Sequence, residues 1–206
     1  MALIDVGQPV PRFEAQDHTG AQVGASALAG ERYVLFFYPK DDSKDCTTQA
    51  CEFSDAASQF AKAGVKVFGV SPDTLKDHQK FVAKHGLGVP LIVDERDAKG
   101  TPRVCDAFGV WQEKSMYGRK YMGVVRTTYV VGADGKVERR WDKVSVTGHV
   151  AAVLGYVRGE EMGVSEREVK KAARKTVKKP AKKPAKKPGK KAATKVAKRG
   201  KARTRK

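Results

Sequence analysis

Cys46 is the residue of this chain whose setting best suits nucleophilic chemistry. It follows an apolar run and the polar loop Pro39–Asp45, and it falls where a helix is predicted to begin. Unpaired backbone N–H groups and the positive end of the helix dipole favour an anion at such a position, so they lower the pKa of a thiol there. A cysteine that only fills space in the core is the alternative. However, the six consecutive polar residues Lys40–Asp45 are an unsuitable wall for an inert buried thiol.

Cys51 lies five residues after Cys46 in the same predicted helix. With a rise of about 1.5 Å and a turn of about 100° per residue, the two Cα atoms would be about 8–9 Å apart. A disulfide tolerates about 7 Å at most, so these cysteines can pair only if the helix opens. The spacing therefore favours a transient catalytic disulfide over a structural one.

The remaining cysteine and the histidines give weaker signals. Cys105 lies on the apolar side of a short predicted helix and is expected in the core, although a role as a backup resolving thiol stays open. A closed metal site needs four ligands, and the sequence has no Cys-x-x-Cys pair and no closely spaced histidines to supply them. The four histidines are scattered without the spacing of a proton relay: His18, His78, His85 and His149.

Apolar runs and helical periodicity predict strands that alternate with helices. Tyr33–Tyr38 is continuously apolar and aromatic, which is typical of a strand buried on both faces. The other predicted strands are Val65–Val70, Leu91–Val93, Arg126–Val131 and Lys136–Trp141, the last two joined by a Gly132–Gly135 hairpin turn. The predicted helices are Cys46–Ala63, Thr74–Lys84, Arg103–Phe108 and a final helix that has Thr147 as its N-cap and ends at Arg158.

The order of these elements predicts an α/β fold with a mixed sheet flanked by helices on both faces. The strands first alternate with helices and then finish in a hairpin and a helix. Because a cysteine suited to redox chemistry opens the helix after the first long strand, a thioredoxin-like fold is the leading candidate.

The charge of the chain is divided unevenly between a body and a tail. Residues 170–206 contain 19 Lys or Arg and no Asp or Glu, whereas residues 1–169 hold 22 basic and 23 acidic residues, a net charge of −1. The tail includes the repeat KKPA-KKPA-KKPG, has almost nothing apolar to bury, and is interrupted by proline too often for a continuous helix. We therefore predict a domain over residues 1–158, an acidic linker over 159–169 and a disordered tail over 170–206.

The positive charge of this tail predicts a polyanionic partner. DNA is the first candidate, followed by RNA, polyphosphate and anionic membrane surfaces, and the binding is expected to be non-specific. The tail resembles the Lys-Pro-Ala repeats of linker-histone tails and of similar bacterial nucleoid proteins. A solvated charge run that only aids solubility is the alternative.

The sequence predicts a protein of a reducing compartment. No apolar run approaches the roughly 18 residues that span a bilayer, and the N-terminus lacks the charged and apolar regions of a signal peptide. Three cysteines are too few for the disulfide scaffold of a small secreted protein. We expect a cytoplasmic location, at the nucleoid if the tail binds DNA.

Two stretches of the sequence resemble a known family. YPKDDSKDCTTQACEFSD and the later GVWQEKSMYGRKYMGVVRTTYVVGADGKV are similar to atypical two-cysteine peroxiredoxins, specifically the peroxiredoxin Q or bacterioferritin comigratory protein class. The similarity covers about residues 4–158. The active-site motif of that family is Pro-x-x-x-Thr/Ser-x-x-Cys. It is matched by Pro39, Ser43 and Cys46, with serine at a position that is usually threonine.

The resemblance implies a thioredoxin-like peroxidase that reduces hydrogen peroxide and organic hydroperoxides without a metal, haem or flavin. It makes Cys46 the peroxidatic cysteine, Cys51 the resolving cysteine, and Arg126 the guanidinium beside the thiolate. It also implies that thioredoxin or a similar dithiol reductant recycles the Cys46–Cys51 disulfide. Because both cysteines lie in one chain, we expect a monomer.

Two other functions compete with this one. The chain could be a nucleic-acid-binding redox sensor whose thioredoxin-like body is a scaffold, or a thioredoxin-like disulfide exchanger. An exchanger would prefer Cys-x-x-Cys to the wider spacing found here. The joint presence of Pro39, Ser43, Cys46 and Arg126 favours the enzyme, since a scaffold has no need of all four.

Overall fold

The computed structural model describes residues 2–116 and 118–160. The predicted tail over 170–206 and most of the predicted linker lie outside these residues. In the part of the chain that is described, every helix is too short or too polar to cross a membrane.

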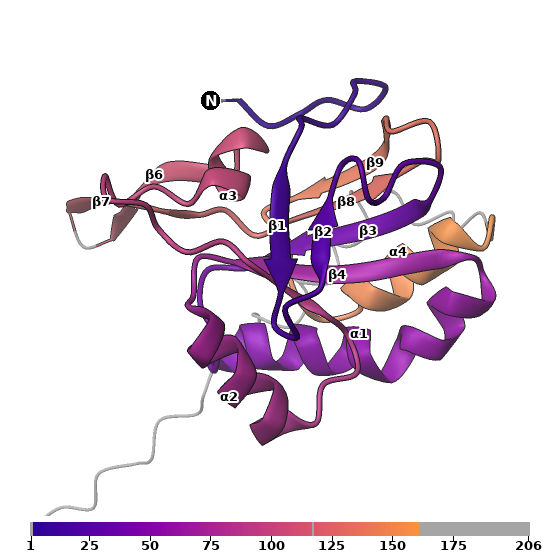
Figure 1. Ribbon diagram of the computed structural model, residues 1–206, viewed down its shortest axis with the longest axis horizontal. Coiled ribbons are helices and arrows are strands. Elements are labelled where there is room, and N and C mark those ends of the chain that lie inside the picture. Colours follow the sequence, from indigo (N-terminus) through magenta and orange to yellow (C-terminus); the bar gives the residue numbers. More distant parts are fainter. Residues whose placement is uncertain (1, 117, 161–206) are drawn as a thin grey trace, which may run out of the picture. The chain divides into compact units, whose positions relative to one another are not determined.

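The centre of the molecule is a mixed seven-stranded sheet in the order β2-β1-β5-β4-β3-β8-β9 (Figure 1). Three neighbouring strands are parallel, and antiparallel strands extend the sheet on both sides. The parallel strands are β3 (Arg32–Phe37), β4 (Val65–Ser71) and β5 (Leu91–Val93). The antiparallel strands are β1 (Glu14–Asp17), β2 (Gln22–Gly24), β8 (Thr127–Val131) and β9 (Val137–Asp142).

Helices cover both faces of the sheet, as the sequence predicted. They are α1 (Lys44–Lys62), α2 (Leu75–His85), α3 (Arg103–Ala107) and α4 (His149–Val157). Side chains of α1, α2 and α4 pack in one hydrophobic cluster, and side chains of α3 pack in a second cluster. This arrangement is the mixed α/β, thioredoxin-like fold.

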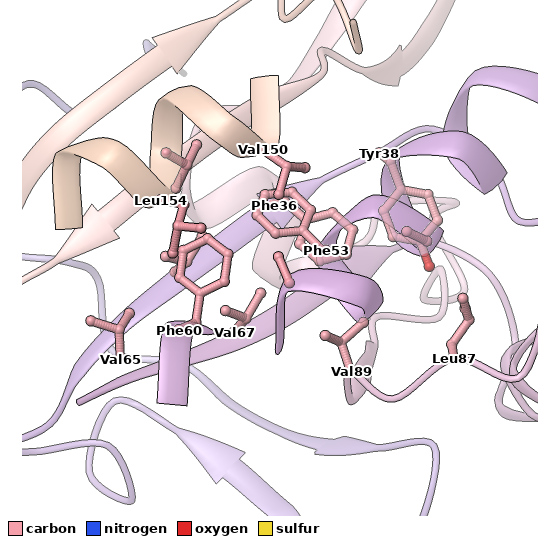
Figure 2. Close-up of a cluster of buried hydrophobic side chains, with 14 of the residues drawn as sticks. Phe36, Tyr38, Phe53, Phe60, Val65, Val67, Leu87, Val89, Val150 and Leu154 are labelled. Atoms are coloured by element: carbon pink, nitrogen blue, oxygen red, sulfur yellow. The ribbon is translucent and has the colours of Figure 1, made fainter. Parts of the chain in front are cut away.

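The central strand β3 divides the core because its side chains alternate between the two faces. Phe36 and Tyr38 lie in the cluster on the α1 side, whereas Leu35 and Phe37 lie in the other. Figure 2 shows the α1-side cluster, in which the rings of Phe36 and Phe53 stack with their centroids 4.4 Å apart. This stacking fixes α1, and with it the predicted reactive cysteine, against the end of β3.

A two-stranded hairpin extends from the body of the domain (Figure 1). Its strands are β6 (Trp111–Met116) and β7 (Arg119–Val124), paired antiparallel with Trp111 opposite Val124. The chain leaves β7 two residues before Arg126 and then enters β8. The hairpin therefore positions the segment that carries Arg126.

Several element boundaries differ from the sequence-based expectations. Helix α1 begins at Lys44, so Cys46 is its third residue, and β8 begins one residue after Arg126. The expected N-cap Thr147 is wrong: the N-cap of α4 is Gly148, whose φ of 74° is in the left-handed region that glycine adopts without strain. Strands β1, β2, β6 and β7 were not predicted at all.

Helix α2 lies within one residue, at each end, of the predicted Thr74–Lys84. Thr74 is the N-cap, and its side chain accepts a hydrogen bond from the backbone N–H of Asp77. Gly86 ends the helix in a left-handed conformation with a φ of 62°.

Candidate active site

Cys46 lies in the first turn of α1, where backbone N–H groups have no partner within the helix. The first bond of the helical ladder runs from the N–H of Thr47 to the carbonyl of Ser43, over 2.8 Å. The N–H of Cys46 precedes this bond, so it has no acceptor in the helix. Ser43 is the N-cap, but its side chain makes no capping bond within the described residues. The helix terminus therefore keeps donors that an anionic or oxygen-containing group can use.

The loop before α1 brings Pro39 and Ser43 close to the start of the helix. The hydroxyl of Ser43 donates to the carbonyl of Lys40 over 3.1 Å. This bond closes the loop on itself and leaves the oxygen lone pairs of the hydroxyl available. Both Pro39 and Ser43 are half-buried.

Arg126 reaches Cys46 from the other side of the site. Its Nη2 lies 3.2 Å from Cys46 Sγ, although the two residues are 80 positions apart in the sequence. Its Nη1 donates to Oε1 of Gln49, which is fully buried one turn after Cys46 on α1. The guanidinium thus bridges the thiol and the amide of the same helix. Gln49 was not identified from the sequence, because a glutamine inside a helix carries no signal of its own.

The Cys46 side chain is only 1% exposed, while Arg126 is half-buried. A positive charge at hydrogen-bonding distance acts strongly on a thiolate that is screened from water, because the effective dielectric constant there is low. The guanidinium and the helix terminus both offer hydrogen-bond donors to the sulfur of Cys46 or to an oxygen beside it.

Cys51 lies on the same helix and is also a free thiol. It is half-buried, and burial together with the negative charge of Asp55 raises its pKa above the ordinary value. The two thiols of the predicted pair therefore lie in different surroundings, because Arg126 contacts Cys46 whereas the negative charge of Asp55 acts on Cys51.

Cys105 is a core residue, as expected, but its second possible role does not fit the structure. It is fully buried in the cluster on the opposite face of the sheet from Cys46. Burial and the nearby Asp94 carboxylate raise its pKa well above the ordinary value. Because the sheet lies between the two thiols, this arrangement argues against Cys105 as a backup resolving thiol.

Polar residues that the sequence analysis passed over hold the loop before α1. Asp41 accepts hydrogen bonds from the hydroxyl of Tyr38 and from Nδ1 of His78, each over 2.8 Å. Asp42 accepts from Lys84 and from Nε2 of His85. His78 and His85 looked unrelated to the site because their partners are 37 and 43 residues away in the sequence.

Lys114 of the β6–β7 hairpin is a second cation near the site. Its Nζ donates to the carbonyl of Val124 over 2.8 Å and so joins β6 to the end of β7. Burial and the charge of Arg126 lower its pKa, and the charge of Cys46 acts in the opposite direction. The positive potential around Cys46 therefore has more than one source.

Residues 2–116 and 118–160 contain no group of three or more His, Cys, Asp or Glu side chains that could hold a metal ion. The groups gathered around Cys46 are a guanidinium, a helix N-terminus and a buried amide. Such a set suits attack by a thiolate on a polarised bond between two heteroatoms, with hydrogen-bond donors for the leaving atom.

A thioredoxin-like fold with an arginine-paired cysteine at the N-terminus of the helix after the central strand defines the class of thiol peroxidases. Comparison with known proteins identifies the family. Residues 6–140 match the model of the AhpC/TSA family, and the chain belongs to this family. Its relatives are peroxiredoxins, so the protein is a peroxidase.

Named relatives cover the domain and not the tail. Peroxiredoxin Bcp of Bacillus subtilis is 39% identical over 151 residues, which are 73% of this chain and 93% of that protein. Peroxiredoxin Bcp of Escherichia coli is 36% identical over 77% of this chain and 98% of its own length. A structure of Xanthomonas campestris peroxiredoxin Q is 37% identical and superposes with a TM-score of 0.67, over 77% of this chain and 97% of that one.

Proposed function

We infer that Cys46 is the peroxidatic cysteine of this enzyme. The Cys46 thiolate attacks one oxygen of a hydroperoxide, the O–O bond breaks, and the other oxygen leaves as hydroxide or alkoxide. The sulfur is oxidised to a sulfenic acid and the peroxide is reduced to water or an alcohol. The observation that carries this proposal is the 3.2 Å contact between Arg126 Nη2 and Cys46 Sγ at an uncapped helix terminus.

The donors around Cys46 have complementary tasks in this reaction. Arg126 stabilises the thiolate and then the charge that develops on the departing oxygen, while the N–H of Cys46 supports the same transition state. The Ser43 hydroxyl can accept a hydrogen bond from the peroxide, and Pro39 shapes the loop that presents it. Gln49 holds the guanidinium in the orientation that the transfer requires.

Cys51 is the resolving cysteine in this proposal. Its thiol condenses with the Cys46 sulfenic acid, which forms the Cys46–Cys51 disulfide and releases water. Because both sulfurs belong to α1, the first turns of the helix must open for the bond to form. No second subunit has to supply a thiol, which supports a monomer as the working form.

A dithiol reductant such as thioredoxin completes the cycle by exchange. Its thiolate attacks one sulfur of the Cys46–Cys51 disulfide and its second thiol releases the reduced enzyme, so two electrons pass to the peroxide in each turnover. Opening of the helix would expose the Cys46 sulfur, which is buried in the closed helix, and would give the reductant access to the disulfide.

Peptide mapping tests the disulfide directly. Lys44 and Lys62 flank both cysteines, so trypsin should release Asp45–Lys62 as one peptide. After one equivalent of peroxide, we expect this peptide to lose the mass of two hydrogen atoms and to regain it after treatment with thioredoxin. A disulfide that joins two chains, or one that includes Cys105, would contradict the proposed cycle.

We propose further that residues 170–206 tether the peroxidase to DNA in the cytoplasm, at the nucleoid, and so concentrate peroxide removal there. The 19 positive charges of the tail support this, because they can neutralise DNA phosphates. Each phosphate neutralised contributes about 0.9 to the slope of the logarithm of the binding constant against the logarithm of the salt concentration. With about a third of those charges engaged, the log–log slope would be about −5 or steeper. The binding should be independent of DNA sequence.

A gel-shift series at increasing salt, on full-length protein and on a variant without Lys170–Lys206, tests the tether. The variant should lose DNA binding and keep peroxide turnover. The proposed tether would be wrong if the truncated protein bound DNA as well as the full chain, or if binding by the full chain did not depend on salt concentration. Either result would leave the proposed peroxidase activity standing.

A further inference from the structure

The loop between β3 and α1 is fixed to α2 through two neighbouring carboxylates. Asp41 is the inner contact: it is 7% exposed, and its partners Tyr38 and His78 are fully buried. The backbone N–H of Asp41 also donates to Asp73 over 2.8 Å. Because Asp41, Tyr38 and His78 are buried, this network anchors one end of the loop.

Asp42 is the outer contact, and it is far more exposed than Asp41. Its φ of 55° lies in the left-handed region, which costs free energy for a residue other than glycine. In this conformation its carboxylate meets the last turn of α2, where it accepts from Lys84 Nζ and, over 2.9 Å, from His85 Nε2. The Asp42 side chain is 48% exposed, so water competes for these contacts.

Asp42 lies just before the part of α1 that carries Cys46, so its contact with α2 bears on the formation of the disulfide. Asp42 is followed directly by Ser43, the N-cap of α1, and Cys46 lies in the first turn that follows. Bringing Cys46 to Cys51 requires that this turn unwinds, and the segment that must then move begins at Asp42. The exposed pair with α2 holds the start of this segment to a neighbouring element.

We propose that Asp42 is a positioning residue, whose contacts with Lys84 and His85 hold the loop closed over the site and whose release sets how often Cys46 can reach Cys51. The inference rests on the proposed Cys46–Cys51 disulfide. Peroxide reacts in the closed form, in which Arg126 and the helix terminus surround the thiol. The disulfide forms only from the open form.

The two steps should therefore respond differently when the contact is lost. The closed form dominates, so a modest rise in the open fraction hardly changes the rate of the peroxide step. The rate of disulfide formation is proportional to the open fraction and rises with it. A residue that only supported the fold would slow both steps or change neither.

The test compares Asp42→Asn with wild type in rapid-mixing experiments that follow each step by quenching and mass spectrometry. We expect disulfide formation to be roughly two- to fivefold faster in Asp42→Asn, the range expected for loss of an exposed charge pair. The peroxide concentration that over-oxidises half of Cys46 should rise by a similar factor. The second-order rate constant for the peroxide step should stay within the error of the wild-type value.

Asp134→Asn is the matched control. Asp134 is an exposed aspartate in the turn between β8 and β9, paired with Lys136 Nζ over 3.7 Å. This substitution removes the same charge from an exposed ion pair and should change neither step. If Asp134→Asn accelerated disulfide formation as much as Asp42→Asn, the effect would come from net charge, and the proposal would be wrong.

A double-mutant cycle with Lys84→Met identifies the partner. Lys84→Met should accelerate disulfide formation less than Asp42→Asn, because His85 still holds the carboxylate. The double variant should match Asp42→Asn alone, since Lys84 then has no carboxylate left to pair with. Additive effects of the two substitutions would show that they act separately, which would overturn the proposed contact.

Hydrogen exchange on the reduced proteins separates a failure of this proposal from a failure of the proposed cycle. The amides of Ser43–Thr47 should exchange roughly two- to fivefold faster in Asp42→Asn, whereas the second half of α1 should be unchanged. Equal exchange in the two proteins would refute the positioning role of Asp42 even if peroxide turnover were normal. Faster exchange without any Cys46–Cys51 disulfide would refute the cycle and with it the role of Asp42 in disulfide formation, and would leave only its hold on the loop.

Discussion

Arg126 is the residue on which the reactivity of Cys46 most depends in this account. Its guanidinium contacts the thiol and Gln49 at the same time, from a segment between two strands. In the proposed reaction, a fixed positive charge at this position would stabilise the charge that develops on the leaving oxygen. This effect does not need the side chain to rearrange during the reaction.

Replacement of Arg126 by methionine should slow the oxidation of Cys46 by peroxide about 10²- to 10³-fold, the usual loss when one preorganised donor is removed from a site of developing charge. Stopped-flow measurement of the second-order rate constant checks this. Arg139→Met is the control, because Arg139 lies over the Trp141 ring, 5.4 Å from its centroid, and does not contact the thiol. A similar loss in both variants would assign the effect to overall charge.

Cys105→Ala should leave peroxide turnover unchanged and lower stability. The side chain is fully buried, so removal of its sulfur leaves a small cavity that costs about 1–2 kcal/mol. Urea unfolding and the thioredoxin-coupled assay check the two halves of this prediction. Loss of disulfide formation in Cys105→Ala would contradict the separation of Cys105 from the site.

Helix α1 is the element that carries both thiols, and its two ends have different tasks. The second half packs Phe53 and Phe60 into the core shown in Figure 2. The first half presents Cys46 and must open for Cys51 to reach it. A helix that is anchored at one end and held by an exposed contact at the other can open locally without unfolding the domain.

Oxidation to the disulfide should lower the hydrogen-exchange protection of Cys46–Phe53 and leave the last turns of α1 protected. The reason is that the disulfide cannot form at the Cα separation of positions i and i+5 in an intact helix. Exchange measured by mass spectrometry on the reduced and oxidised forms checks this. Equal protection in the two forms would be evidence against an intrahelical disulfide.

The elements that the sequence predicted are those with strong periodicity or continuous apolar runs. Three predicted elements were close to the observed β3, α1 and α2: Tyr33–Tyr38, Cys46–Ala63 and Thr74–Lys84. Strands β1 and β2, which lie at one side of the sheet, were missed because they are short and rich in polar residues. The β6–β7 hairpin was missed because its strands mix charged and apolar side chains.

The candidate site was predictable to the extent that its residues belong to a local motif. Pro39, Ser43, Cys46 and Cys51 lie within 13 positions of one another. Arg126 was recognised only through a resemblance, because an isolated arginine carries no sign of its partner. The contacts of Gln49, His78 and Lys114 depend on tertiary structure, so nothing in the local sequence could have revealed them.

At the scale of the whole molecule, one buried histidine should couple stability to pH. His149 lies in the core, where its Nε2 is 2.8 Å from the hydroxyl of Thr128. Burial and, to a smaller extent, the charge of Arg126 lower its pKa to about 4. As the pH falls below about 6.5, the unfolded chain binds a proton at His149 before the folded domain does, so the unfolded state gains stability.

The free energy of unfolding should therefore decrease between about pH 6.5 and pH 4 by up to about 3 kcal/mol from this residue alone. Urea unfolding of full-length protein at several pH values measures the change. His149→Gln, which cannot be protonated in this range, should be less stable at pH 7 and should lose less stability as the pH falls. An unchanged pH slope in His149→Gln would contradict the assignment.

Single-turnover consumption of peroxide without any reductant shows whether Cys46 is the nucleophile. Wild type, Cys46→Ser and Cys51→Ser are each mixed with excess hydrogen peroxide, and peroxide loss and the mass of Asp45–Lys62 are followed together. Cys51→Ser should consume about one equivalent rapidly, with a sulfenic acid at Cys46, before slower over-oxidation. Cys46→Ser should show no rapid phase, because a serine hydroxyl is a poor nucleophile near neutral pH. A rapid phase of normal size in Cys46→Ser would show that another residue attacks the peroxide, and the account would be wrong.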